Sequence, residues 1–237
     1  VVLSLATSNG TDDKNQNAGV LTLVNTTMTY NAAFTNVGTL NIGESSTFTA
    51  PSVVNNGAIN FTALSAKLTA QVGLTIVDEV NDKDYKIVYQ DGTYQFVAKQ
   101  FVAQIYDVNN NTNDDRRYES LAEAATAAQN GETIQLLWNE GDAAISMAAT
   151  FVGNKTVTIK GTANVDWSKG WFYVGRNGAA DGKVIFDNAN LTSAPSNSNS
   201  GFGIHVSGRE KDANNKYDGT LVIKNSTIAL DYLINRG

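Results

Sequence analysis

The sequence predicts an all-β chain in which short strands stack as a solenoid, and three observations indicate this. Glycines recur every 19 residues in the first third of the chain, at Gly19, Gly38 and Gly57. Apolar and polar residues alternate after each glycine, as in a strand that buries one face. The same pattern returns late in the chain, at residues 182–191 and 219–228.

Each repeat places its apolar residues at equivalent positions. A unit of about 19 residues is too short to bury its own apolar face, and stacking similar units solves this problem. We therefore expect each unit to form one coil whose backbone pairs with the coils on either side. The columns predicted to face inward are Leu21, Leu40 and Ile59, then Leu23, Ile42 and Phe61, and finally Met28, Phe48 and Leu68.

The late repeats align with the first repeat without a gap. In all three, an asparagine follows the apolar positions, at Asn25, Asn188 and Asn225. Asparagine tolerates the left-handed backbone conformation that a sharp turn requires. We therefore predict that these are turn residues whose stacked amides bond between coils. Insertions such as 196–200 and 210–218 lengthen the late coils, and insertions at one turn of a solenoid commonly build its binding face.

The middle of the chain, residues 78–117, breaks the repeat and is predicted to be a short linker that contains a β-hairpin. Asp91 and Gly92 lie between two β-rich runs, which is a strong hairpin signal. Residues 101–106 are predicted to form a further strand and residues 109–117 a polar loop.

One capping α-helix is expected within residues 118–131. Ser120 and Glu123 form a capping box, and an Asn-Gly pair ends the helix. We expect the helix to cover the open end of a second β-helical segment, 118–237, because an uncovered end would expose unpaired strand edges. The first segment is expected to comprise residues 1–77.

Two sequence patterns resemble those of a known fold class. The pattern G-x-L-x-I-x-N-S-T-I resembles the repeats of right-handed parallel β-helices of the pectate-lyase-like class, as found in bacterial cell-surface and adhesin-like proteins. The string Y-x-S-L-x-E-A-x-x-A-A-x-x-G-E-T-I-x-L-L, which begins at Tyr118, is similar to the opening of many bacterial β-helix domains. The resemblance covers about residues 1–77 and 132–237 and implies a right-handed parallel β-helix solenoid, secreted and extracellular at the cell surface.

Composition excludes several classes of function. The net charge of −6 argues against a surface that follows phosphates, so we expect no nucleic-acid partner. The absence of cysteine excludes disulfides and thiolate metal sites. No apolar run reaches the roughly 18 residues that cross a bilayer, so we expect no membrane insertion within this chain. Strand-like sequence begins at Val1 and an apolar stretch ends near Gly237, which favours a piece of a longer protein.

Five residues are the candidates for a ligand site. Trp171 and Tyr173 belong to the densest aromatic cluster, and Arg176 and Arg209 follow on equivalent turns. Aromatic faces near arginine can stack on sugar rings, although Trp171 could instead be a core residue. His205, the single histidine, alternates with apolar residues and is expected to face outward, where it would either serve the site or be an ordinary surface residue.

These observations favour a secreted bacterial adhesin-like module that binds a glycan or a host surface glycoprotein through its late loops. The alternatives are a structural stalk or spacer with no ligand of its own, and a polysaccharide lyase or glycoside hydrolase. Glycoside hydrolases need two carboxylates about 5–10 Å apart. Asp187 aligns with Lys224 rather than with another acid. We therefore predict no enzymatic activity, no metal and no cofactor.

Overall fold

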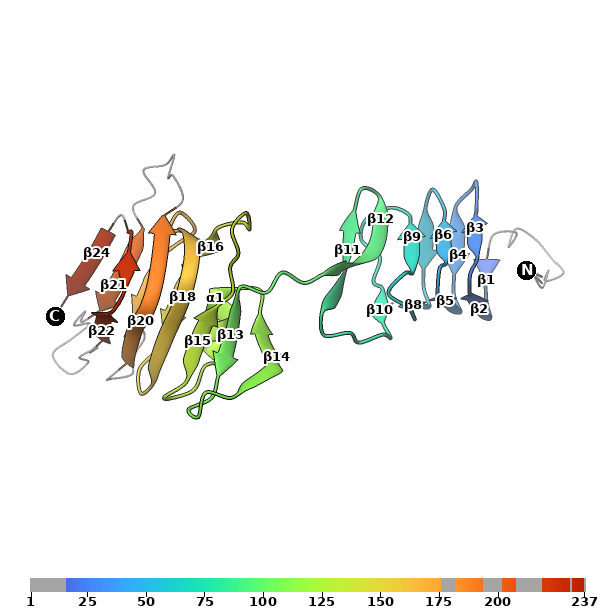
Figure 1. Ribbon diagram of the computed structural model, residues 1–237. Helices are drawn as coiled ribbons and strands as arrows, with labels where there is room; N and C mark the ends of the chain where they lie inside the picture. Colours follow the sequence, from blue (N-terminus) through green and yellow to red (C-terminus); the bar gives the residue numbers. More distant parts are fainter. Residues whose placement is uncertain (1–15, 176–181, 194–201, 208–218, 231, 237) are drawn as a thin grey trace, which may run out of the picture. The chain divides into compact units, whose positions relative to one another are not determined.

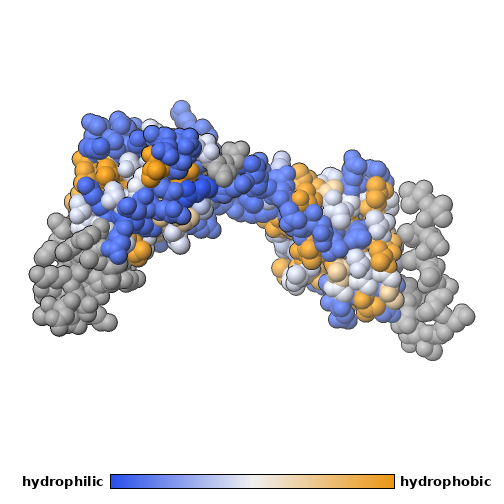
Figure 2. Space-filling view, turned by 90° about the horizontal axis from the view of Figure 1, so that it is seen from below, coloured by the Kyte–Doolittle hydropathy of each residue, from blue (hydrophilic) through white to orange (hydrophobic). Residues whose placement is uncertain are grey.

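The computed structural model describes residues 16–175, 182–193, 202–207, 219–230 and 232–236. In this part the chain is mostly β, as predicted, with a single helix (Figure 1). The chain divides into two compact units, unit 1 (Val1–Lys99) and unit 2 (Gln100–Gly237). On both units hydrophobic and hydrophilic residues are interspersed over the visible face (Figure 2).

In its described residues, unit 1 contains three sheets, and each sheet takes one short strand from every repeat. All strand pairs between repeats are parallel. The first sheet holds β1 (Gln16–Asn17), β4 (Phe34–Asn36) and β7 (Val53–Asn55). The second sheet holds β2 (Val20–Leu23), β5 (Thr39–Ile42), β8 (Ala58–Phe61) and β10 (Val77–Asp78). The third sheet begins with β3 (Thr27–Thr29), β6 (Thr47–Thr49) and β9 (Lys67–Thr69).

The strand register confirms the predicted apolar columns of unit 1. Leu40 is the partner of both Leu21 and Ile59, and Phe48 is the partner of both Met28 and Leu68. In the two inner repeats these side chains are fully buried. The core of unit 1 is therefore a set of aliphatic and aromatic columns that cross the strands.

The glycine period has a steric cause. A Cβ atom at Gly38 would lie 2.0 Å from the carbonyl oxygen of Gly19, and one at Gly57 would lie 2.0 Å from that of Gly38. The Thr39 N–H donates to the Gly19 oxygen at 2.8 Å, so the two backbones meet closely at this turn. A side chain at the second or third glycine would separate the repeats.

The stacked asparagine amides of unit 1 lie at positions other than the predicted one. The Nδ2 group of Asn17 donates to Oδ1 of Asn36, and Nδ2 of Asn36 donates to Oδ1 of Asn55, both at 2.8 Å. Asn36 is 0% exposed, so its amide must be paired inside the protein. Asn25 has the predicted left-handed conformation, with φ of 50°, but does not belong to this ladder.

The buried ladder leads to a stability prediction. Replacing Asn36 with alanine is expected to destabilise unit 1 by about 2 kcal/mol, because the amides of Asn17 and Asn55 lose their shared partner. Asn41 provides a matched control, since its Oδ1 accepts from Asn60 at 2.9 Å on a partly exposed face. Denaturation followed by far-UV circular dichroism should show a smaller loss for Asn41→Ala. Equal losses would contradict a special role for the buried ladder.

A hairpin ends the third sheet of unit 1. Strands β11 (Tyr85–Gln90) and β12 (Thr93–Ala98) are antiparallel, and β12 is also antiparallel to β9. Tyr94 on β12 lies opposite Leu68, and its hydroxyl accepts from the Leu74 N–H at 2.7 Å and donates to the Gln71 carbonyl oxygen at 3.1 Å. The predicted hairpin therefore exists, but it extends unit 1 rather than forming a separate linker.

Unit 2 contains two sheets in the described residues. The larger holds β14 (Thr112–Tyr118), β13 (Ala103–Tyr106), β15 (Thr133–Leu136), β18 (Thr156–Asp166), β20 (Gly182–Ser193) and β22 (Gly219–Lys224), with β16 (Ile145–Ser146) and β23 (Thr227–Ile228) beside β18 and β20. The smaller holds β17 (Ala149–Phe151), β19 (Phe172–Val174), β21 (Gly203–Ser207) and β24 (Tyr232–Arg236). Strands from β15 onward pair in parallel, whereas β13 is antiparallel to both of its neighbours.

The second half of the predicted linker also belongs to a unit. Residues 109–117 were expected to form a polar loop, but β14 covers most of them and pairs with β13. The polar composition of β14 gives no strand signal, and pairing with β13 decides its conformation. The structure thus divides residues 78–117 between unit 1 and unit 2.

The helix α1 (Leu121–Ala127) confirms the predicted capping signal. The Ser120 side chain accepts a hydrogen bond from the Glu123 N–H at 3.2 Å. The apolar face of the helix, which includes Leu121 and Ala124, is buried in the core of unit 2 beside β13, β14 and β17. The helix therefore lies at the β14–β13 end of this unit (Figure 1).

Two cationic side chains, Lys155 and Arg116, lie at the C-terminal end of α1. Lys155 Nζ donates to the carbonyl oxygens of Ala125 and Ala128, at 2.6 and 3.1 Å. The Arg116 guanidinium binds Glu132 through both terminal nitrogens, with the Nη2–Oε2 pair at 2.8 Å. Cations are favourable near a helix C-terminus. Burial lowers the pKa of Lys155, although the nearby Glu132 opposes this effect.

Candidate binding site

The candidate site lies on the smaller sheet of unit 2, where alternation separates core from surface. Phe172 on β19 is the partner of Ile204 on β21, and both side chains are fully buried. The next pair in register is Tyr173 and His205, and both side chains are partly exposed. This confirms the sequence-based expectation that His205 alternates with inward-facing neighbours.

Four ring side chains form a cluster on this sheet, which we call the aromatic cluster: Trp171, Tyr173, Phe202 and His205. The ring centroids of Trp171 and His205 are 5.8 Å apart, and those of Tyr173 and His205 are 5.4 Å apart. Trp171 lies 6.5 Å from Tyr173 and meets Phe202 edge-on, at 5.8 Å and 88°. The edge-on contact of Trp171 with Phe202 is one of the favourable geometries for two aromatic rings.

The structure thus brings together three of the five predicted site residues. Arg176 and Arg209, the other two, lie outside the described residues. Phe202 was not predicted, although its position directly before β21 parallels the position of Trp171 directly before β19. That parallel is the sequence signal that could have identified it.

The contacts of the tryptophans separate core residues from site residues. Trp167 is buried, and its indole N–H donates to the Ala229 carbonyl oxygen at 2.8 Å. Trp171 is partly exposed, and the core position next to it is filled by Phe172. Trp171 is therefore available to a ligand in a way that Trp167 and Phe172 are not.

The aromatic cluster offers ring faces bordered by one polar and one apolar side chain. Along the same outward row, Thr150 on β17 precedes Tyr173, and Ile234 on β24 follows His205. Partly exposed rings can stack on the apolar faces of sugar rings, while hydroxyl groups can bond to sugar hydroxyls. The arrangement is therefore suited to binding, and its rings supply no carboxylate for acid–base chemistry.

The turn asparagines of unit 2 surround a carboxylate on the larger sheet. Asn188 and Asn225 have φ of 55° and 50°, so both adopt the predicted left-handed conformation. Their amides donate to Oδ1 of Asp187, at 3.0 and 3.2 Å, rather than to each other. Lys224 Nζ lies 3.1 Å from Oδ2 of the same carboxylate, in the strand register that the sequence alignment predicts.

These contacts determine the charge state of Asp187. Hydrogen bonds from Lys224, and secondly from Asn225, hold the pKa of Asp187 below its ordinary value. The carboxylate therefore remains ionised at neutral pH and is poorly suited to donate a proton. Among the described residues, no three histidine, aspartate or glutamate side chains are grouped closely enough to hold a metal ion. No helix in this part of the chain is long and apolar enough to cross a membrane.

Comparison with protein-family models, with curated proteins and with solved structures yields no match. The residues of the aromatic cluster and their geometry are therefore the basis for a functional assignment.

Proposed function

We propose that this chain is an adhesin-like module of a secreted or cell-surface bacterial protein, and that it binds a glycan or a host surface glycoprotein through the aromatic cluster. The observation that carries the proposal is the placement of Tyr173 and His205 as outward partners on neighbouring strands, with Trp171 beside both. This arrangement collects three partly exposed rings on one face.

We propose further that each unit is a right-handed parallel β-helix. The order of strands in unit 1 supports this architecture, since three strands from three sheets recur in the same sequence in successive repeats. Parallel pairing at equivalent positions and continuous inward columns also favour it. A scaffold of this kind holds side chains of successive coils at fixed spacing, which would keep the aromatic cluster in place.

The chemistry of the cluster favours a carbohydrate over other ligands. Partly exposed aromatic rings recognise the apolar face of a pyranose ring, and the nearby polar groups fix its orientation. The chain carries a net charge of −6, which disfavours a polyanionic partner such as nucleic acid. A neutral or weakly charged glycan satisfies both conditions.

Replacing Trp171 with alanine is expected to weaken glycan binding at least about tenfold, because a stacking face and its apolar contact area are lost. The measurement is binding of the purified chain to an array of glycans and mucins, followed by titration with the best ligand. Tyr173→Ala should have a similar effect. Tyr85→Ala is the matched control, since Tyr85 is an exposed aromatic on β11 of unit 1. Binding that survives both unit 2 substitutions would place the ligand elsewhere.

A structural spacer is the second candidate function. Its specific support is the regularity of unit 1, where the glycine, asparagine and apolar positions recur at intervals of 19 or 20 residues. A spacer needs no ligand, so the folded chain should then bind no member of the array. Saturable binding that depends on Trp171 would exclude a purely structural role.

A further inference from the structure

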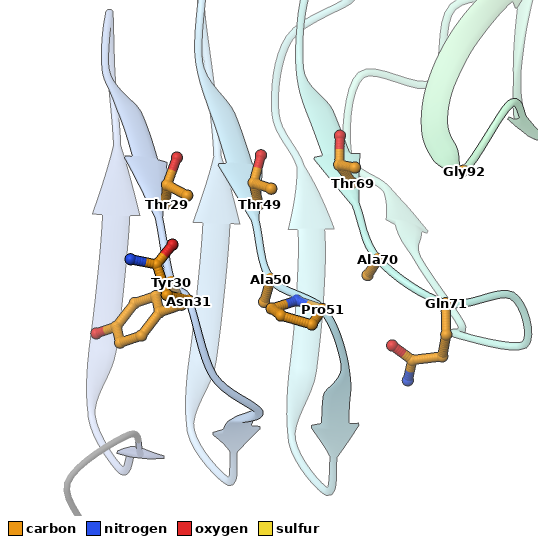
Figure 3. Close-up of a pocket in the computed structure, with 10 residues that line it drawn as sticks. All are labelled: Thr29, Tyr30, Asn31, Thr49, Ala50, Pro51, Thr69, Ala70, Gln71 and Gly92. Carbon is orange, nitrogen blue, oxygen red and sulfur yellow. The ribbon is translucent and has the colours of Figure 1, made fainter.

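Unit 1 carries a groove that is built from equivalent positions in three repeats. The groove has a volume of about 530 Å³. One wall is formed by Thr29, Thr49 and Thr69, which lie in a row on adjacent strands (Figure 3). The rest of the lining comes from the next two positions of each repeat and from the hairpin turn. These residues are Tyr30, Ala50 and Ala70, then Asn31, Pro51 and Gln71, and finally Gly92.

The threonine wall presents hydroxyl groups to the groove. Thr29 and Thr49 face outward on β3 and β6, and within the described residues neither side chain makes a hydrogen bond. The Thr69 hydroxyl is paired with that of Thr93, at 3.1 Å. The Gln71 amide is also engaged, because it bonds to the backbone of Val53 in both directions. The groups able to bind a ligand therefore concentrate at the first two repeats.

The groove is electrically neutral. None of its lining side chains is charged, and burial raises the pKa of the Tyr30 hydroxyl, which keeps that group protonated. Between residues 16 and 77 the sequence contains only Glu44 and Lys67 as charged residues. A phosphate or polyanionic ligand would find no counter-charge here. A neutral ligand rich in hydroxyl groups is the better match.

The backbone of the groove lining cannot accept an added peptide strand. The N–H groups of Tyr30, Ala50 and Ala70 donate to carbonyl oxygens of the following segment, at 2.8, 3.0 and 3.2 Å. Peptides that extend a sheet need unpaired backbone groups at an edge. An occupant of this groove must therefore bind to side chains, not to the backbone.

We propose that the groove is a second binding site, for a neutral linear polysaccharide that lies across the repeats with one sugar residue opposite each strand. Neighbouring strands are about 4.8 Å apart, which is close to the length of one sugar residue in an extended chain. The hydroxyls of Thr29 and Thr49 then each face one sugar, whereas the Thr69 hydroxyl is shared with Thr93. The Tyr30 ring packs against Phe34 and Phe48 at the first repeat. The site is independent of the aromatic cluster in unit 2.

The test compares two threonines of the same strand, Thr49 inside the groove and Thr47 outside it. Both face outward on β6, and valine preserves the shape of each side chain while removing the hydroxyl. NMR titration of the full chain with the neutral β-linked glucose di-, tri- and tetrasaccharides is expected to give saturable shifts at Thr29 and Thr49. Thr49→Val should weaken this binding about threefold to tenfold, and Thr47→Val should leave it unchanged.

Two further expectations follow from the geometry. Affinity should rise from the disaccharide to the trisaccharide and then level, because the groove crosses three repeats. A galacturonate trisaccharide should bind no better than the neutral one. The absence of saturable shifts at the threonine row, or equal loss in both valine variants, would overturn the groove site.

A variant of unit 2 separates this inference from the function proposed above. Trp171→Ala should leave the shifts at Thr29 and Thr49 intact, since the two sites use different residues. If glycan binding depends on Trp171 alone, the groove inference fails and the proposed function stands. If it depends on Thr49 alone, the assignment of the aromatic cluster fails and the groove stands.

Discussion

Replacing Gly38 with alanine is expected to destabilise unit 1 by at least about 3 kcal/mol. The added Cβ atom would lie 2.0 Å from the Gly19 carbonyl oxygen, so the two backbones must move apart. That movement breaks the 2.8 Å hydrogen bond from the Thr39 N–H to the same oxygen. It also disturbs Asn17, whose side-chain amide donates to the Thr39 carbonyl oxygen at 2.9 Å.

The first glycine of the series is a matched control for this substitution. A Cβ atom at Gly19 would meet no atom within 4 Å, so Gly19→Ala should change stability by about 0.5 kcal/mol or less. Far-UV circular dichroism during chemical denaturation measures both variants. Fluorescence of the three tryptophans, all of which belong to unit 2, should stay unchanged in each. Equal denaturation midpoints for the two variants would contradict the steric explanation of the glycine period.

The inward columns of unit 1 could be predicted because two independent periods specify them. Alternation within a strand selects the buried face, and the interval between repeats selects the partner in the next strand. Leu40 satisfies both conditions, and the structure pairs it with Leu21 and Ile59. Where the sequence shows both the alternation within a strand and the interval between repeats, the strand register can be predicted.

Strand β14 could not be predicted because neither period is present in it. Its residues include two aspartates and two arginines in succession, and such a run is typical of a loop. The strand forms because β13 offers an edge, and Val102 N–H donates to the Tyr118 carbonyl oxygen at 2.8 Å where the pairing begins. Long-range pairing of this kind leaves no local mark in the sequence.

The asparagine ladder was predicted as a type of contact but assigned to the wrong residues in unit 1. Both Asn25 and Asn36 lie near turns, and alternation of apolar and polar residues alone does not show which amide points into the protein. The decisive signal is the motif Asn-x-Gly, which recurs at Asn17, Asn36 and Asn55. The glycine allows close approach of the backbones, and this brings the preceding amides within hydrogen-bonding distance.

The candidate site was predicted in part for a similar reason. Tyr173 and His205 each alternate with buried neighbours, so their outward direction follows from the strand pattern. Their proximity depends on the register between β19 and β21. That register lies outside the late repeats that the sequence aligns, 182–191 and 219–228. Phe202 lies outside the strand, and its contact with Trp171 follows from the path of the chain rather than from any period.

Replacing Arg116 with methionine is expected to destabilise unit 2 by about 3 kcal/mol at neutral pH, because Glu132 then stays buried without its hydrogen-bonded cation. Glu132 is 5% exposed, and its carboxylate otherwise accepts only from the Gln129 N–H, at 2.7 Å, among the contacts of the described residues. Tryptophan fluorescence during urea denaturation measures this effect in unit 2. Lys169→Met removes an equal charge from an exposed position and should lower the free energy of unfolding far less. A similar loss in both variants would show that net charge, not the buried pair, is responsible.

The same pair predicts an unusual response to pH. The hydrogen bond from Arg116 is the largest influence on Glu132 and holds its pKa below the ordinary value of 4.5, although burial acts in the opposite direction. The stabilisation by this carboxylate is therefore complete above pH 4.5 and is lost as the pH falls through its lowered pKa. Without Arg116, burial becomes the largest remaining influence and raises the pKa of Glu132, so protonation then stabilises the folded state. The free energy of unfolding of unit 2 is compared with that of a Glu132→Gln variant at each pH. Relative to this reference, a fall in pH should lower the stability of the native protein but raise that of the Arg116→Met variant. A shared direction of change in both proteins would contradict the assignment of this ion pair as the source of the pH dependence.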